Sequence, residues 1–154
     1  MAAAALAVVG YIGTAEAQNV RVFRGAALAG FIPGQSLHCS MAYLRGSEEG
    51  GGTVQVTTYV YDATGRLLSR TDPVELRRGQ FHTYIIDRDG LPVEGETRTR
   101  RAQVRVEFQF QVDASNTLIS DKDFLVTVEG VNNSSGGSYF TGTPPVSDDN
   151  FGNG

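Results

Sequence analysis

The chain has 154 residues and a mass of 16.5 kDa, which is enough for one domain, since single domains usually contain about 100–200 residues. Val, Leu, Ile and Phe make up about a quarter of the sequence, so a hydrophobic core is expected. A net charge of −4 disfavours nucleic acid as a partner, and a single cysteine excludes an intramolecular disulfide or a multi-cysteine metal site.

The first seventeen residues differ from the rest of the chain. Residues 2–13 are small and apolar, but this run is too short to cross a bilayer as a helix, so no transmembrane span is expected. Ala15 and Ala17 have the spacing of a signal-peptidase site, although no Lys or Arg precedes them. Two hypotheses remain open for residues 1–17: a cleaved export signal, or a retained N-terminal helix or strand. We expect export to the periplasm, the cell surface or the medium.

The body of the chain alternates polar and apolar residues, which is the period of a half-buried β-strand. In residues 103–112, QVRVEFQFQV, all ten positions alternate, so the valines and phenylalanines share one face. Residues 53–61, TVQVTTYVY, place Val54 and Val56 on one face and Tyr59 and Tyr61 on the other. The other segments that resemble strands are 20–24, 35–45, 67–70, 74–77, 81–86, 124–131 and 138–141.

The turns between these segments have a recurring composition. Asp62, Asp87 and Asp113 each begin a four-residue segment that ends in Gly or Asn. An Asp carboxylate accepts backbone N–H bonds at the start of a turn, and Gly or Asn tolerates the left-handed conformation that closes a hairpin. Short strands with frequent turns predict an all-β fold, a single antiparallel β-sandwich of about seven or eight strands.

The predicted organisation has three parts. Residues 1–17 are the signal or N-terminal hydrophobic segment, residues 18–142 are the β-sandwich domain, and residues 143–154 are a flexible C-terminal tail rich in Gly, Pro and Asn. Within the domain, the Gly-rich residues 46–52 are expected to be a mobile connection between two strands.

A family resemblance rests on the order of these elements. A Gly-Gln entry, a long strand, and then YVYDATGRLL and VELRRGQFHTYII resemble secreted bacterial sandwiches of immunoglobulin or fibronectin type, over roughly residues 20–131. The Cys…Trp…Cys pattern of antibody domains is absent, because the chain has no Trp and only Cys39. The resemblance implies an architecture and export, and it carries over no functional residue.

The sequence offers little to a catalytic site, and we predict that the protein is not an enzyme. Cys39 lies in the apolar register of its strand, which predicts a buried side chain, and the neighbouring His38 should face the opposite side. His38 and His82 are both interpreted as solvent-face residues. Glu107 and Glu129 could form a glycosidase pair only if the fold brought them together.

Metal or cofactor binding is not expected either. A calcium site would need oxygen donors from several loops, and no segment has the donor spacing of an EF-hand. The candidate donors are Asp87, Asp89, Asp121, Asp123, Asp148 and Asp149.

Partner binding is the function that the side chains favour. Arg101 and Arg105 belong to an arginine cluster that could hold acidic groups or could be ordinary solvent-face charge. Tyr59 and Tyr61 are either exposed anchors or part of a second buried face. We predict a structural or accessory module that binds protein partners or itself. The alternative is an adhesion domain that binds carbohydrate or depends on calcium.

Overall fold

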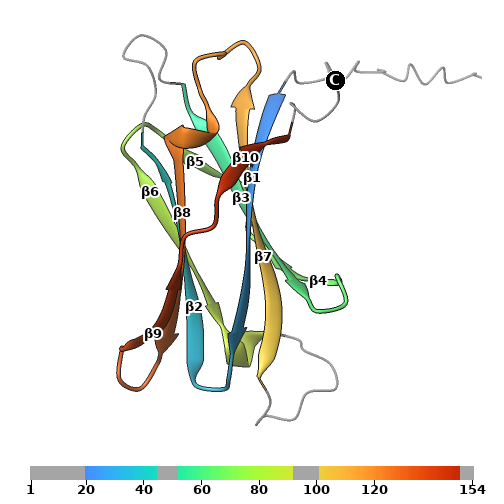
Figure 1. Ribbon diagram of the computed structural model, residues 1–154, viewed down its shortest axis with the longest axis vertical. Coiled ribbons are helices and arrows are strands. Elements are labelled where there is room, and N and C mark those ends of the chain that lie inside the picture. Colours follow the sequence, from blue (N-terminus) through green and yellow to red (C-terminus); the bar gives the residue numbers. More distant parts are fainter. Residues whose placement is uncertain (1–19, 45–51, 92–100, 150–154) are drawn as a thin grey trace, which may run out of the picture.

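The computed structural model describes residues 20–44, 52–91 and 101–149, which form two antiparallel β-sheets and no α-helix. The arrangement resembles a β-sandwich, so the prediction of an all-β protein is confirmed (Figure 1). The described residues contain ten strands rather than seven or eight. They are β1 (Val20–Phe31), β2 (Gln35–Tyr43), β3 (Val54–Asp62), β4 (Leu67–Arg70), β5 (Val74–Leu76), β6 (Phe81–Asp87), β7 (Ala102–Asp113), β8 (Phe124–Asn132), β9 (Ser138–Gly142) and β10 (Val146–Asp148).

The first sheet, which we name sheet A, has the order β10-β1-β7-β3-β4, and β5 also pairs with β3. The second, sheet B, has the order β6-β2-β8-β9. The chain passes between the sheets several times, from β1 to β2, from β2 to β3, and again between β5 and β8. Segments that are distant in sequence therefore lie side by side in both sheets.

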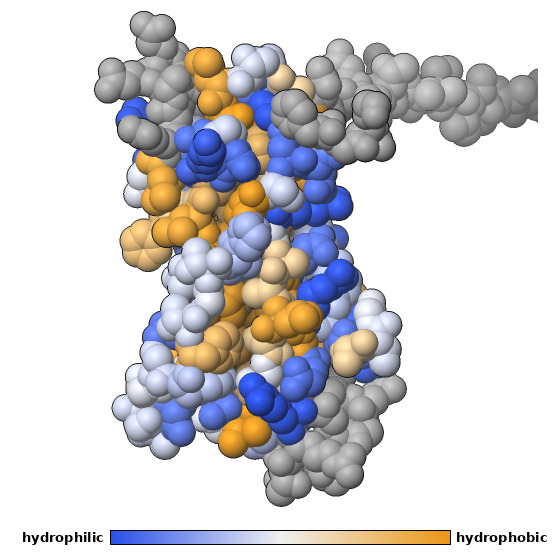
Figure 2. All heavy atoms as spheres, viewed as in Figure 1, coloured by the Kyte–Doolittle hydropathy of each residue, from blue (hydrophilic) through white to orange (hydrophobic). Residues whose placement is uncertain are grey.

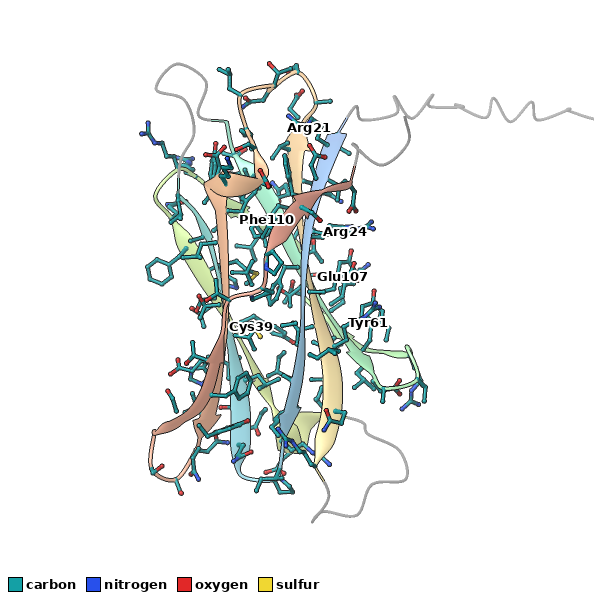
Figure 3. All side chains as sticks on the ribbon, in the orientation of Figure 1. Arg21, Arg24, Cys39, Tyr61, Glu107 and Phe110 are labelled. Atoms are coloured by element: carbon teal, nitrogen blue, oxygen red, sulfur yellow. The ribbon has the colours of Figure 1, made fainter. Side chains whose placement is uncertain are left out.

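The core lies between the sheets, and alternation along the strands builds it. On β7 the residues from Val104 to Val112 that face inward are buried, as the period of two predicts. Phe110 of sheet A stacks on Phe124 of sheet B with ring centroids 4.4 Å apart, and Phe23 lies 5.0 Å from the same ring. This aromatic cluster joins the two layers, and Figure 3 shows its member Phe110 between them.

Residues 146–149 of the C-terminal segment differ from the flexible tail that the composition predicted for residues 143–154. Val146–Asp148 forms β10, which pairs with Phe23–Gly25 at the edge of sheet A. Arg21 forms an ion pair with Asp148, and Arg24 Nε lies 2.9 Å from a carboxylate oxygen of Asp149. Local composition could not predict this strand, because the residues that pair with it lie on β1, about 120 residues earlier in the chain.

Several predictions fall on residues that the structure does not describe. The leader hypothesis for residues 1–17 and the Gly-rich connection at 46–52, except for Gly52, lie outside the described residues. No helix in the described parts of the chain is long and apolar enough to cross a membrane.

Candidate functional site

The outer face of sheet A brings together three of the four predicted binding residues. Tyr59 and Tyr61 lie on β3, where Tyr59 is opposite Glu107 and Tyr61 is opposite Arg105 of β7. Their rings are nearly parallel, with centroids 6.4 Å apart. The Arg105 guanidinium lies over the Tyr61 ring, 4.6 Å from its centroid, which is a cation–π contact. Figure 3 shows Tyr61, Glu107 and Arg24 on this outer side of the sheet.

Polar side chains of β1 and β7 extend this aromatic pair. Glu107 lies 3.8 Å from both Arg24 and Arg105, so one carboxylate serves two guanidinium groups. The Gln109 amide lies 3.2 Å from the Tyr59 hydroxyl and 3.0 Å from an Arg24 nitrogen, in the orientation that lets its oxygen accept from Arg24. We call this group the sheet A surface; its members are Arg24, Tyr59, Tyr61, Arg105, Glu107 and Gln109. Figure 2 shows hydrophilic residues gathered on the sheet A side of the molecule.

An open pocket of about 500 Å³ borders the sheet A surface. The β3–β4 turn forms one wall, and β1 and β7 contribute the rest. The pocket includes Leu28, whose side chain is 82% exposed, and the Arg105 side chain that also contacts Tyr61. The lining residues are Leu28, Asp62, Ala63, Thr64, Gly65, Gln103, Val104 and Arg105.

The turn that forms this wall is held by one carboxylate. Asp62 Oδ1 accepts hydrogen bonds from the Thr64 hydroxyl (2.6 Å), the Thr64 N–H (2.9 Å) and the Arg66 N–H (3.0 Å). These bonds, the Thr64 hydroxyl first, lower the pKa of Asp62 to about 2. The wall therefore keeps its geometry and its negative charge at neutral pH.

The fourth predicted residue, Arg101, lies elsewhere. Its guanidinium donates to the carbonyl oxygen of Gly30 at 3.3 Å, and its side chain occupies the space that a Cβ at Gly30 would need. The guanidinium end of the arginine therefore packs directly against the backbone of Gly30 on β1. The prediction had grouped Arg101 with Arg105 by sequence proximity alone.

Sequence reasoning missed two members of the sheet A surface, Arg24 and Gln109. Alternation on β7 already placed Gln109 on the outer face with Arg105 and Glu107. No local signal linked these residues to Arg24 or to Tyr59, because that link depends on β7 lying between β1 and β3.

The residues considered for catalysis are separated by the fold. Cys39 is fully buried between the sheets, and burial raises the pKa of its thiol to about 12. The adjacent His38 lies in the outer register of sheet B, as expected. His82 was interpreted as a solvent-face residue, but it pairs with Met41 in the inward register of β6 and is only half-buried because β6 is an edge strand.

The fold also separates the two glutamates considered for hydrolysis, and it uses an aspartate considered for calcium binding to cap a turn. Glu107 lies on the outer face of sheet A, whereas Glu129 pairs with His38 and Thr141 on the outer face of sheet B. Asp123 caps a short 3₁₀ turn by accepting the Ser120 N–H at 2.8 Å. Within residues 20–44, 52–91 and 101–149, no three His, Cys, Asp or Glu side chains lie close enough together to hold a metal ion.

Comparison with known proteins adds no relative: the sequence matches no protein family, and no curated protein or solved structure matches the chain.

Proposed function

We propose that this protein is an exported, non-catalytic β-sandwich of immunoglobulin or fibronectin type that serves as a protein-binding module in the cell envelope or an extracellular assembly. The observation that carries the proposal is the sheet A surface, where two stacked tyrosines lie beside an arginine that lines an open pocket. Tyr and Arg are the residue types that contribute most binding energy at protein interfaces.

The contacts within this surface also support binding. Arg105 is held by Tyr61 and Glu107, and Tyr59 is held by Gln109, so a partner would not have to order these side chains. Ordering a long side chain on binding costs roughly 0.5–1.5 kcal/mol, which a preorganised surface avoids. Export is supported by the Ala15-x-Ala17 pattern of the leader.

The experiment compares partner recovery by variants. The tagged full-length chain is expressed in its native cells, which are lightly cross-linked and gently solubilised. We expect a partner that is recovered with the wild type and lost with the double variant Tyr59→Ala/Tyr61→Ala. Leu118→Ala is the matched control, because Leu118 is 63% exposed and lies outside the sheet A surface. Equal recovery by the double variant, or a chain that travels alone, would contradict the proposal.

Carbohydrate binding is the second candidate, because the same pocket combines polar donors and acceptors with an adjacent aromatic ring. A glycan array separates the two functions. If the ligand is a glycan, the signal should disappear in Tyr61→Ala and Arg105→Ala and should be insensitive to EDTA, since Asp62 and Asp123 are engaged in turns. An array on which the wild-type chain binds no glycan would contradict this second candidate.

A further inference from the structure

The edges of the two sheets are protected to different extents. Four edge strands are short or irregular. β10 has three residues and follows two prolines, and β5 also has three residues. β4 has four residues and a register shift in its pairing with β3, and β9 has a register shift in its pairing with β8. The part of β1 beyond β10 is capped where Arg101 donates to Gly30. Short strands, bulges and charged caps are devices that prevent edge-to-edge association.

Strand β6 lacks all of these devices. It is seven residues long, FHTYIID, and pairs with β2 in one continuous register. It contains no Pro or Lys, and its only charged residue is Asp87 at its end. No described strand pairs with its other side. Phe81 and Ile85 point to the outer face with 73% and 55% of their surface exposed.

The hydrogen bonds beside β6 determine which of its backbone groups are free. The Gly79 N–H donates to the Tyr43 carbonyl oxygen (2.7 Å) and the Tyr43 N–H donates to Gln80 (3.0 Å), so Tyr43 turns its polar groups toward β6. The direction alternates along an antiparallel ladder, so the next bonded pairs are Met41–His82 and Cys39–Tyr84. The N–H and C=O groups of the intervening residues, Phe81, Thr83 and Ile85, therefore point to the open edge.

We propose that β6 pairs with β6 of a second copy of this chain, antiparallel and with Thr83 on the two-fold axis, so that two four-stranded sheets become one of eight strands. In this register Phe81 of each copy lies beside Ile85 of the other copy. The three pairs Phe81–Ile85, Thr83–Thr83 and Ile85–Phe81 supply about six backbone hydrogen bonds.

Charge complementarity selects a second copy as the occupant. In the same register, the exposed Asp87 of each copy reaches the turn before β6 of the other, which carries the exposed Arg77 and Arg78. An acid therefore meets bases at both ends of the paired strands, and no like charges meet at the centre. The interface uses sheet B, so it is independent of the sheet A surface.

The test is the oligomeric state of the full-length chain by analytical ultracentrifugation. We expect a dimer for the wild type, and dimerisation weakened at least about tenfold in Thr83→Lys, because two like charges would meet on the axis. Thr141→Lys is the matched control, since Thr141 is exposed on the same sheet but lies on β9. A wild type that is monomeric at all soluble concentrations, or a dimer insensitive to Thr83→Lys, would overturn the proposal.

A second pair of variants tests the register and does not depend on charge. Antiparallel bonded pairs have Cα atoms about 5.5 Å apart, which a disulfide can bridge. Thr83→Cys should form a covalent dimer on oxidation and Thr141→Cys should not, with the buried Cys39 unreactive in both. A failure of Thr83→Cys to cross-link would refute this register. Thr83→Lys should leave partner recovery through the sheet A surface unchanged, which separates the two proposals.

Discussion

The outer faces of the two sheets use the same strand geometry for different chemistry. Sheet A presents charged groups on β1 and β7, where Glu107 lies within ion-pair distance of both Arg24 and Arg105 beside the tyrosines. Sheet B presents uncharged rows: Phe81, Ala42 and Leu125 in one, and Thr83, Ser40 and Thr127 in the next. A charged, hydrogen-bonded face suits a selective partner, whereas two uncharged rows beside the open edge of β6 suit a copy of itself; Glu129 lies in the row after them. The two proposed interfaces therefore lie on different sheets of the same molecule and differ in their chemistry.

The largest expected effect tests whether stability resides in the interior that both faces share. Phe124→Ala should lower the free energy of unfolding by about 3–5 kcal/mol, because it removes a ring that packs on Phe110 and Phe23. Phe81→Ala, on the outer face of sheet B, should change it by no more than about 0.5 kcal/mol. Denaturant unfolding at low protein concentration, where the monomer dominates, measures both. Similar losses would mean that the outer face of sheet B stabilises the monomer.

A smaller effect distinguishes the two sides of sheet B at adjacent positions. Cys39→Ser should destabilise by about 1–3 kcal/mol, since it puts a hydroxyl into a fully buried apolar site. His38→Ala, one residue away on the outer face, should cost no more than about 0.5 kcal/mol. Thermal unfolding of the two variants measures both losses of stability. A larger loss in His38→Ala than in Cys39→Ser would mean that His38, and not Cys39, lies on the side of β2 that faces the core.

On sheet A, the contact between Tyr61 and Arg105 should contribute a coupling of about 0.5–1 kcal/mol, the range of exposed cation–π pairs. A double-mutant cycle with Tyr61→Leu and Arg105→Ala measures it. Zero coupling would show that the surface is not preorganised and would remove one support of the proposed binding function.

The smallest effect is a pH dependence in the pocket wall. The pKa of Asp62 is lowered to about 2 in the folded chain, from an ordinary value of about 4, so its ionised form favours folding. This contribution is present above about pH 4 and is lost as the pH falls toward 2. Asp62→Asn should therefore flatten part of the acid-induced loss of stability while leaving sheet B unchanged. An unchanged acid profile would show that these turn hydrogen bonds are not maintained in solution.

Much of the fold followed from local patterns. Alternation on β7 and β3 gave the inward residues, and Thr58 at an inward position of β3 is buried with its hydroxyl 3.1 Å from the Met41 sulfur. The Asp62 turn formed as expected, with its carboxylate accepting from the Thr64 N–H and with Gly65 in the left-handed conformation. The Asp113 carboxylate likewise accepts from the Ser115 N–H, but Asn116 does not adopt the expected left-handed conformation. What failed was local reasoning about segments with distant partners, of which β10 is the clearest example.

The sequence by itself determined the all-β class and the sides of β2, β3 and β7 that face the core, because the direction of a side chain on a regular strand depends only on a period of two. Only the tertiary structure determined that Tyr59 and Arg24 lie on one surface. It also determined that Arg101 lies outside this surface, where it binds the carbonyl oxygen of Gly30, and that β6 is an open edge strand. These outcomes depend on which strands are neighbours. Neighbours are selected by long-range packing of the whole core, and no short stretch of sequence encodes that choice.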